Sequence, residues 1–118
     1  MKYILLIYGD EEAMDEPERQ KCYGESTQLA HDLNRAGQYV AAAPLLPTSA
    51  ATSVRVRDGK RLVTDGPFAE TREQLGGFFM VDACDLDEAI AIASRIPMAR
   101  LGVIEIRPVK EIHGLPVD

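Results

Sequence analysis

The stretch Lys2-Tyr3-Ile4-Leu5-Leu6-Ile7-Tyr8 decides the fold that we predict for this chain. It is apolar at almost every position and ends at Gly9 and Asp10, which is typical of a buried central strand. Successive side chains of a strand alternate between its two faces. Apolar side chains therefore point both ways: Tyr3, Leu5 and Ile7 to one face, and Ile4, Leu6 and Tyr8 to the other.

The remaining elements follow from periodicity and capping signals. Apolar positions recur at helical spacing over residues 17–36, with Pro17 suited to the first turn and Gly37 to the C-cap. Asp85, with Glu88 three residues later, predicts the start of a second helix. That helix ends at Pro97. Five further strands are predicted, two of them joined as a hairpin by an Asp-Gly turn: residues 38–46, 53–57, 61–64, 78–81 and 103–109.

This order of elements predicts the fold class. Two β-α-β units separated by a hairpin give an α+β sandwich of the ferredoxin-like type, a βαβ-β-βαβ arrangement. We place the domain at residues 1–109 and an irregular C-terminal tail at residues 110–118. Right-handed crossovers put both helices on one face of the sheet. The other face is left apolar, so we expect a homodimer with two sheets packed face to face.

Composition limits the classes of function. The 118 residues are 46% hydrophobic and 27% charged, which is ordinary for one folded domain. The net charge of −6 disfavours binding to nucleic acid and to anionic membranes. The apolar N-terminal run is too short to span a membrane and carries no cleavage signal, so we expect a cytoplasmic protein. Cys22 and Cys84 are expected to be reduced, partly buried thiols.

The segment Asp65-Gly66-Pro67-Phe68 has two interpretations. Asp, Gly and Pro form turns, and Phe can anchor a loop. Alternatively the loop closes a cleft, with Asp65 as its carboxylate and Pro67-Phe68 as an apolar wall. Glu70 and Glu73 follow, and paired carboxylates can act as acid and base or bind a hard cation. We favour a solvated role for Glu73. The candidate ligand-binding residues are Asp65, Gly66, Pro67, Phe68 and Glu70.

Two charged pairs lie on predicted strands. Glu105 and Arg107 share a strand face with Val103, on the side that we expect to face a second subunit. They form either an interface ion pair or part of a polar pocket, and we favour the interface. Arg55 and Arg57 share one face of the hairpin, where an arginine could orient an anionic ligand.

The two histidines offer no catalytic arrangement in the sequence. His31 falls nearly opposite Leu29 and Leu33 on the first helix and is expected to be exposed and inert. His113 lies in the tail. No nucleophilic triad, phosphate-binding loop, dinucleotide fingerprint or zinc spacing is visible. We therefore expect no cofactor and no metal.

Three segments resemble the DGPF branch of the YCII-related family. They are Met1–Asp10, the run from Asp58 to Phe78 centred on Thr64–Thr71, and Glu105–Val109. The resemblance implies a bacterial protein with a ferredoxin-like fold and a dimer of the dimeric α/β-barrel type. Related YCII proteins are thought to have a cleft between subunits with a His–Asp pair, and a few act on chlorinated aromatic compounds. DGPF members are often encoded beside extracytoplasmic-function sigma factors, which implies a regulatory setting.

One departure from the family pattern affects the function. The first-helix histidine of the relatives falls near Ser26 here, and His31 does not match it. The His–Asp pair is therefore not carried over. Our first hypothesis is a small-molecule-binding or accessory protein with a cleft near the DGPF loop. The alternatives are a small cofactor-free enzyme, lyase-like or hydrolase-like, that uses Asp65 or Glu70 as acid or base, and a protein-interaction domain.

Overall fold

The structure is a computed structural model and describes residues 1–116. Two helices and six strands follow one another, with short 3-10 turns at Thr48–Ala50 and Pro97–Arg100. The elements in chain order are β1 (Lys2–Gly9), α1 (Glu16–Arg35), β2 (Tyr39–Pro44), β3 (Thr52–Arg57), β4 (Lys60–Asp65), β5 (Gln74–Asp82), α2 (Leu86–Ala93) and β6 (Val103–Pro108). Residues 117–118 of the predicted tail lie outside the described residues.

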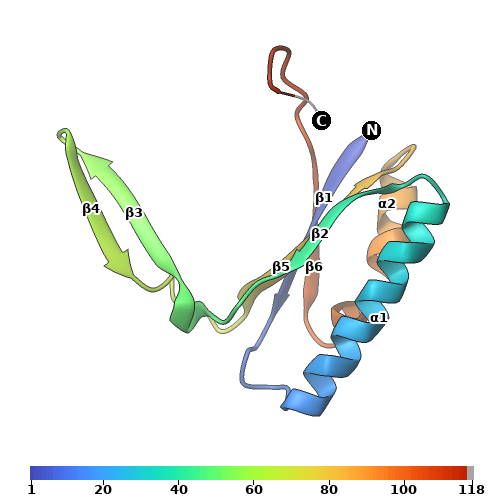
Figure 1. Cartoon of the computed structure of the whole chain (residues 1–118), viewed down its shortest axis with the longest axis horizontal. Helices are drawn as coiled ribbons and strands as arrows, with labels where there is room; N and C mark the ends of the chain where they lie inside the picture. The colour runs from blue at the N-terminus through green and yellow to red at the C-terminus, as the bar shows by residue number, and fades with distance from the viewer. Residues whose placement is uncertain (117–118) are drawn as a thin grey trace.

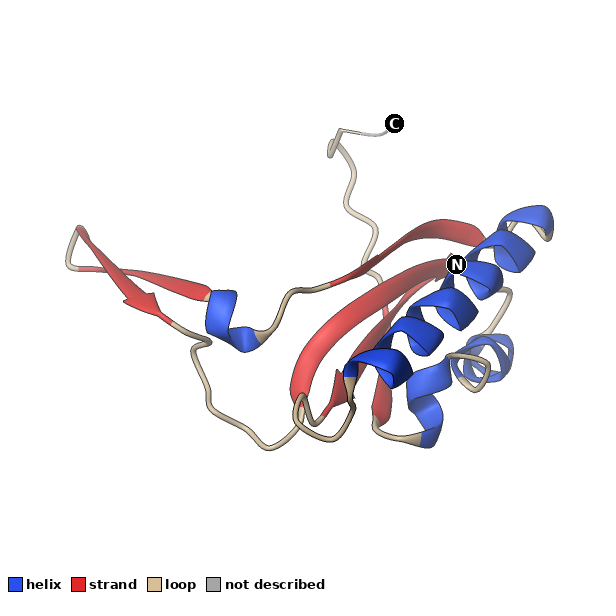
Figure 2. Cartoon of the chain, turned by 60° about the horizontal axis from the view of Figure 1, so that its bottom comes forward, coloured by secondary structure: helices blue, strands red, loops and turns tan. Residues whose placement is uncertain are grey.

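Four strands form the main sheet in the order β2-β5-β1-β6, and every neighbouring pair is antiparallel. This is the predicted α+β, ferredoxin-like arrangement. The long apolar strand β1 lies inside the sheet, between β5 and β6. Both helices lie on the same side of this sheet, as predicted, and leave the other side open (Figures 1 and 2).

Local capping explains where the helices begin. The Asp15 carboxylate accepts a hydrogen bond from the Glu18 backbone N–H, and the Glu18 side chain returns the interaction to the Asp15 N–H. At α2 the Asp85 carboxylate accepts from the Glu88 N–H at 2.9 Å, as predicted. The Glu88 side chain, however, accepts from the Cys84 N–H instead of the Asp85 N–H. One of the two hydrogen bonds of the predicted capping box is therefore present, and the other forms with the backbone of the preceding residue.

The core lies between the sheet and the two helices. Its centre is built from Leu5 and Val81 of the sheet, Leu33 of α1 and Ile96 after α2, all with no exposed surface. The pairing register puts the other alternation on the open face. Leu6 lies opposite both Phe78 and Glu105. The open face therefore carries half-buried apolar side chains beside the exposed Glu105 and Arg107, which confirms that these two charges point away from the helices.

Strands β3 and β4 leave the body of the molecule. They pair only with each other, in register from Thr52↔Asp65 to Arg57↔Lys60, so the predicted hairpin is confirmed as a separate two-stranded sheet. We call residues 52–65 the hairpin arm. Figure 1 shows it in green, extending away from α1 and α2. The radius of gyration is 16.0 Å, against about 13 Å for a compact chain of this length. The arm and the segment after β6, which both project from the body of the molecule in Figure 1, account for this extension.

Strand β5 begins earlier than the sequence suggested. We expected Thr71–Leu75 to be a polar connection and Gly76-Gly77 to precede the strand, whereas β5 starts at Gln74. The two glycines lie inside the ladder, where Gly77 pairs with Ile7 on one side and Pro44 on the other. Weak strand propensity was overridden here by pairing with two neighbours.

Candidate functional site

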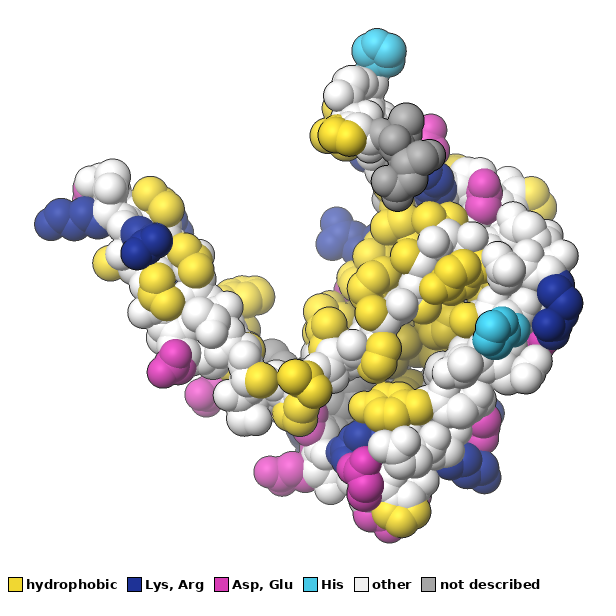
Figure 3. Space-filling view, viewed as in Figure 1, with side chains coloured by type: hydrophobic (Ala, Val, Ile, Leu, Met, Phe, Trp, Pro, Cys, Tyr) yellow, Lys and Arg dark blue, Asp and Glu magenta, His cyan; other side chains and the backbone are white. Residues whose placement is uncertain are grey.

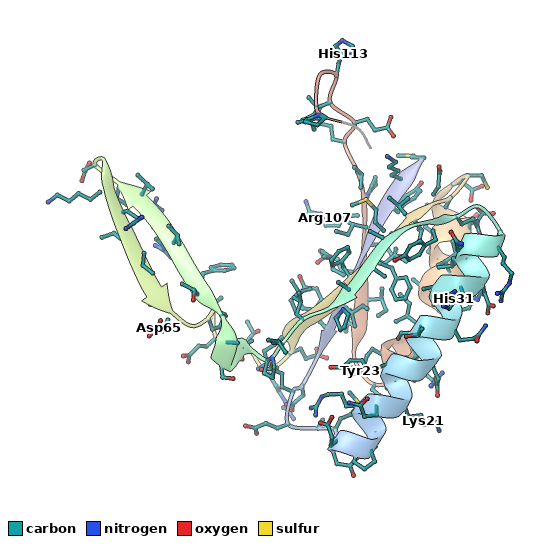
Figure 4. The ribbon with its side chains drawn as sticks, viewed as in Figure 1. Lys21, Tyr23, His31, Asp65, Arg107 and His113 are labelled. Carbon is teal, nitrogen blue, oxygen red and sulfur yellow. The ribbon has the colours of Figure 1, made fainter. Side chains whose placement is uncertain are left out.

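A cavity of about 850 Å³ lies between α1 and the adjoining half of the sheet. Its walls come from α1, β2 and β5, and from the segments that follow β1 and β2. In Figure 3 apolar side chains line the hollow between the sheet and α1. His31 lies at the rim of this hollow, in the position labelled in Figure 4. This volume is within the range of small-molecule sites, about 300–1,000 Å³.

Small residues on the sheet create this space. The strands facing α1 contribute Ala42, Gly76 and Gly77 to the lining, where larger side chains would fill it. Gly77 has a further reason to be glycine, because a Cβ there would lie 2.9 Å from the Ala43 carbonyl oxygen and 3.2 Å from the Pro44 Cα. The close approach of β2 to β5 thus requires the glycine that also leaves the cavity open.

Helix α1 has two functionally different faces. Leu29 and Leu33 are buried against the sheet and hold the helix in place. The face beside them lines the cavity and is mostly polar. Its members recur every three or four residues along the helix: Tyr23, Ser26, Thr27, Ala30, His31 and Asn34. The cavity therefore has an apolar floor on the sheet and a wall of hydroxyl, imidazole and amide groups on the helix.

Charged groups lie at one end of the cavity. Arg19 is the one Lys or Arg among the lining residues of the chain as described here. Its guanidinium donates to the Glu16 carboxylate at 3.0 Å and to the carbonyl oxygens of Glu11 and Met14. The Glu11 carboxylate accepts from the Thr48 backbone N–H at 2.8 Å and from its hydroxyl at 2.5 Å. These bonds tie the β1–α1 connection to the root of the hairpin arm.

The two cysteines differ in position. Cys22 lines the cavity, and its Sγ lies 3.8 Å from the Met14 Sδ. Burial raises the pKa of the Cys22 thiol, with a further contribution from the Glu25 carboxylate. Cys84 is exposed at the start of α2, away from the cavity lining. Both are free thiols, as predicted, but the partial burial expected for the two cysteines holds for Cys22 and is wrong for Cys84.

The residues that the sequence singled out lie elsewhere. Asp65, Pro67, Phe68 and Glu70 are exposed, Phe68 to 84%, and none of them lines the cavity. Figure 4 places Asp65 at the base of the hairpin arm, away from α1. Gly66 has a positive φ of 103°, which favours glycine, and its N–H donates to the Ala51 carbonyl at 2.8 Å. The turn interpretation therefore accounts for Gly66. Ligand binding by the loop remains a prediction, because it concerns what the loop meets beyond its own chain.

His31 is the residue whose role the sequence underestimated. It is exposed, as predicted, yet it lies on the cavity wall and not on an unrelated surface. The signal that could have revealed it was a second helical stripe, polar and displaced from Leu29 and Leu33, with Ser26 in its centre. Ser26 also lines the cavity. The position expected for the relatives' histidine is thus on this wall, and the chain's own histidine lies five residues further along it.

The described residues were compared with two kinds of feature, a metal-binding cluster and a membrane-spanning helix. Within residues 1–116, no group of three or more His, Cys, Asp or Glu side chains is arranged to hold a metal ion. None of the helices in that range combines the length and the apolar character needed to cross a membrane.

These features define an α+β protein of ferredoxin-like topology with a ligand-sized cavity beside its first helix. The model of the YCII-related domain matches residues 1–113, and the chain therefore belongs to the YCII-related family.

One protein sequence and one solved structure are also similar to this chain. The chain is 37% identical over 113 residues to the uncharacterised protein R00369 of Rhizobium meliloti (strain 1021), covering 92% of this chain and 91% of the relative. Among solved structures it resembles 5-chloro-2-hydroxyhydroquinone dehydrochlorinase (TftG) of Burkholderia phenoliruptrix AC1100, in its complex with 2,5-dihydroxybenzoquinone. The TM-score is 0.59 at 13% identity, covering 93% of this chain and 94% of TftG. That likeness shows a shared fold.

Proposed function

We propose that this chain is a small-molecule-binding protein that works as a homodimer and holds its ligand in the cavity between α1 and the sheet. The observation that carries the proposal is the cavity itself, about 850 Å³ with an apolar floor and a polar helical wall. Such a combination buries the body of a ligand and orients it through a few polar groups. The DGPF loop follows the arm, and the segment after β2 that leads into the arm lines the cavity.

The lining favours a small aromatic ligand with polar substituents. Phe79 and Ala42 offer an apolar floor, and the hydroxyls of Tyr23 and Ser26 with His31 offer hydrogen-bonding groups on the opposite wall. The fold neighbour TftG was solved with 2,5-dihydroxybenzoquinone, a planar ring of comparable size that also carries polar substituents.

The homodimer is supported by the open face of the sheet. Ile4, Leu6, Phe78 and Met80 lie on that face, half-buried and covered by none of the helices and strands in residues 1–116. A second sheet packed on this face would cover the apolar side chains, as in sandwiches whose sheets lie about 10 Å apart. This is the dimeric α/β-barrel arrangement that the family resemblance implies.

Filling the cavity tests the proposal. Thr27→Trp places a large side chain at an exposed lining position of α1, and Ala42→Phe fills the floor. Ala91→Phe, at an exposed position of α2 away from the cavity lining, is the matched control. A panel of hydroxylated aromatic compounds is screened by thermal shift. We expect a stabilising compound to lose its effect in both cavity variants and to keep it in the control. A stabilisation that survives in Thr27→Trp and Ala42→Phe would contradict the proposed site.

The enzymatic alternative is supported by a different observation, namely that the fold neighbour is a dehydrochlorinase. In the form that we predicted, Asp65 or Glu70 acts as acid or base in a cofactor-free reaction. Both carboxylates are exposed, so they could reach substrate only in a cavity of another subunit. Turnover of a cavity ligand that disappears in Asp65→Asn or Glu70→Gln, with binding retained, would support this alternative.

The interaction-domain alternative is supported by the exposed apolar arm described below. The sigma-factor setting is a separate proposal that follows from the family resemblance. It is tested by transcription of the neighbouring genes in a deletion strain, with and without the stabilising compound.

A further inference from the structure

The hairpin arm exposes both of its faces. Directly opposite residues of a hairpin share a face, so the register places Val54, Val56 and Val63 on one side, at 59%, 61% and 56% exposure, together with Arg61. The other side carries Arg55, Arg57 and Lys60, with Leu62 among them. An isolated two-stranded hairpin is only marginally stable in water. The arm therefore presents a mainly apolar face and a mainly cationic face, neither of which the described chain covers.

Charge indicates what covers the arm. Four cations and two carboxylates give residues 52–65 a net charge of +2, while the rest of the chain carries −8. The strongest run of negative charge is residues 10–18, with no cation before Arg19: Asp10, Glu11, Glu12, Asp15, Glu16 and Glu18. Opposite charges on two surfaces of one chain favour association between copies of that chain. The acidic run lies at the cavity end that Asp10, Glu11 and Glu16 line.

The arrangement of the arm and the sheet fits a second copy. Both figures of the ribbon place the helices on one side of the main sheet and the arm on the other, so the arm and the open face diverge around a wide hollow (Figures 1 and 2). The space-filling view shows this hollow empty (Figure 3). A second sheet packed on the open face would enter it, and the helical side of that second copy would then face the arm.

Two-fold symmetry brings the complementary charges to the same level. In Figure 1 the tip of the arm lies toward the end of the molecule that holds the N-terminus, and residues 10–18 lie at the opposite end. A two-fold axis between the sheets and perpendicular to the strands exchanges these ends in the partner. The acidic run of the second copy is thereby placed at the level of the first copy's basic tip.

We propose that the hairpin arm clasps a second copy of this chain, with its basic tip against the acidic run at the mouth of that copy's cavity. Each cavity then takes part of its mouth from the other subunit's arm. The inference rests on the homodimer of the proposed function and is independent of which ligand binds. It also assigns the apolar face of the arm, since packing on the helical side of the second copy removes its valines from water.

Mixed cross-linking tests the contact. In a Cys22→Ser, Cys84→Ser background, Lys60→Cys is placed in one chain and Glu12→Cys in another, and the two chains are mixed and treated with a short bis-maleimide. We expect a covalent heterodimer. Asp87→Cys, in the first turn of α2, replaces Glu12→Cys as the matched control and should give no product. A yield no higher than that of the control overturns the clasp.

The mass of the assembly distinguishes failure of the homodimer from failure of the clasp. Sedimentation of the unmodified protein is expected to give a dimer. A monomer at micromolar concentration overturns the homodimer and the clasp together. A dimer without the Lys60–Glu12 product overturns the clasp alone. A Lys60–Glu12 product that sediments under native conditions as an assembly larger than a dimer also overturns it, since the arm would then join different dimers.

A charge exchange provides a second readout that needs no cross-linker. A two-fold dimer holds two Lys60–Glu12 contacts, so Lys60→Glu should weaken the dimer about two- to thirty-fold at low salt, the range for two exposed ion pairs. Mixing it with Glu12→Lys chains should restore the affinity, and the effect should fade at high salt. Lys110→Glu, in the exposed segment after β6, controls for net charge. Equal effects of Lys60→Glu and Lys110→Glu would overturn the proposed contact.

Discussion

Replacing Leu33 by alanine tests whether α1 is anchored to the sheet by one face only. Leu33 has no exposed surface and packs in the core with Leu29, Phe79 and Val81. Truncating a fully buried leucine costs about 3–5 kcal/mol, through lost transfer free energy and the space left behind. For 118 residues the entropy of unfolding is about 0.25 kcal/mol/K. We therefore expect Tm to fall by about 12 °C or more.

Two matched variants lie on the other face of the same helix. Ser26 and Asn34 line the cavity, and neither belongs to the core cluster. Replacing either by alanine should change the free energy of unfolding by no more than about 0.5 kcal/mol, or roughly 2 °C in Tm. Urea unfolding of all three variants, with a constant slope, checks the comparison. If Ser26→Ala or Asn34→Ala destabilises as much as Leu33→Ala, that face of α1 is packed in solution and the cavity is not open.

Three substitutions and one chemical modification probe the surroundings of the site. Gly102→Ala should destabilise by about 1–3 kcal/mol, because its Cβ would lie 2.0 Å from the Tyr8 carbonyl oxygen. Gly24→Ala meets nothing within 4 Å and should stabilise α1 by up to about 1 kcal/mol, so urea unfolding that ranks the two alike would refute this reasoning. Glu11→Ala removes both acceptors of Thr48 and should cost about 1–2 kcal/mol; hydrogen exchange should then speed up at the Thr48 amide, and unchanged exchange would contradict the anchoring role. Alkylation of Cys22 by iodoacetamide in a Cys84→Ser variant should be slow at pH 7 and accelerate toward high pH, because burial raises the pKa of that thiol and only the thiolate reacts. A compound bound in the cavity should slow the alkylation of Cys22 and leave Cys84 unaffected in Cys22→Ser.

Local sequence signals were sufficient for most of the fold. The apolar run at residues 2–8 predicted an inner strand, and Pro17 and Asp85–Glu88 predicted helix starts close to those that the structure places at Glu16 and Leu86. The Asp-Gly turn at residues 58–59 predicted the hairpin. These signals act within a few residues, so they can be read without knowing the tertiary structure. The early start of β5 could not, because it depends on β1 and β2 as pairing neighbours.

The cavity could not be predicted in the same way. A cavity forms where facing residues are too small or too far apart to touch. Here Ala42 and Gly77 lie opposite the polar face of α1. The distance between α1 and the sheet depends on the tertiary structure, and no local sequence pattern indicates it. The sequence directed attention to Asp65–Phe68 because the motif is distinctive, although its members lie on an exposed loop. The sequence predicted an exposed and inert His31 because this residue lies off the leucine stripe. The same displacement brings His31 to the cavity wall.

The most direct test of the central claim is to map a ligand onto residues by NMR. Titrating 2,5-dihydroxybenzoquinone or a hydroxylated aromatic compound of similar size into methyl-labelled protein should shift the Ala30 and Ala42 resonances saturably, since both line the cavity. Ala91, exposed on α2, should not move. Saturable shifts of Ala30 and Ala42 would confirm the cavity as the binding site. Shifts confined to Val54 and Val56 of the hairpin arm, or no saturable shift with any compound of this class, would contradict the account.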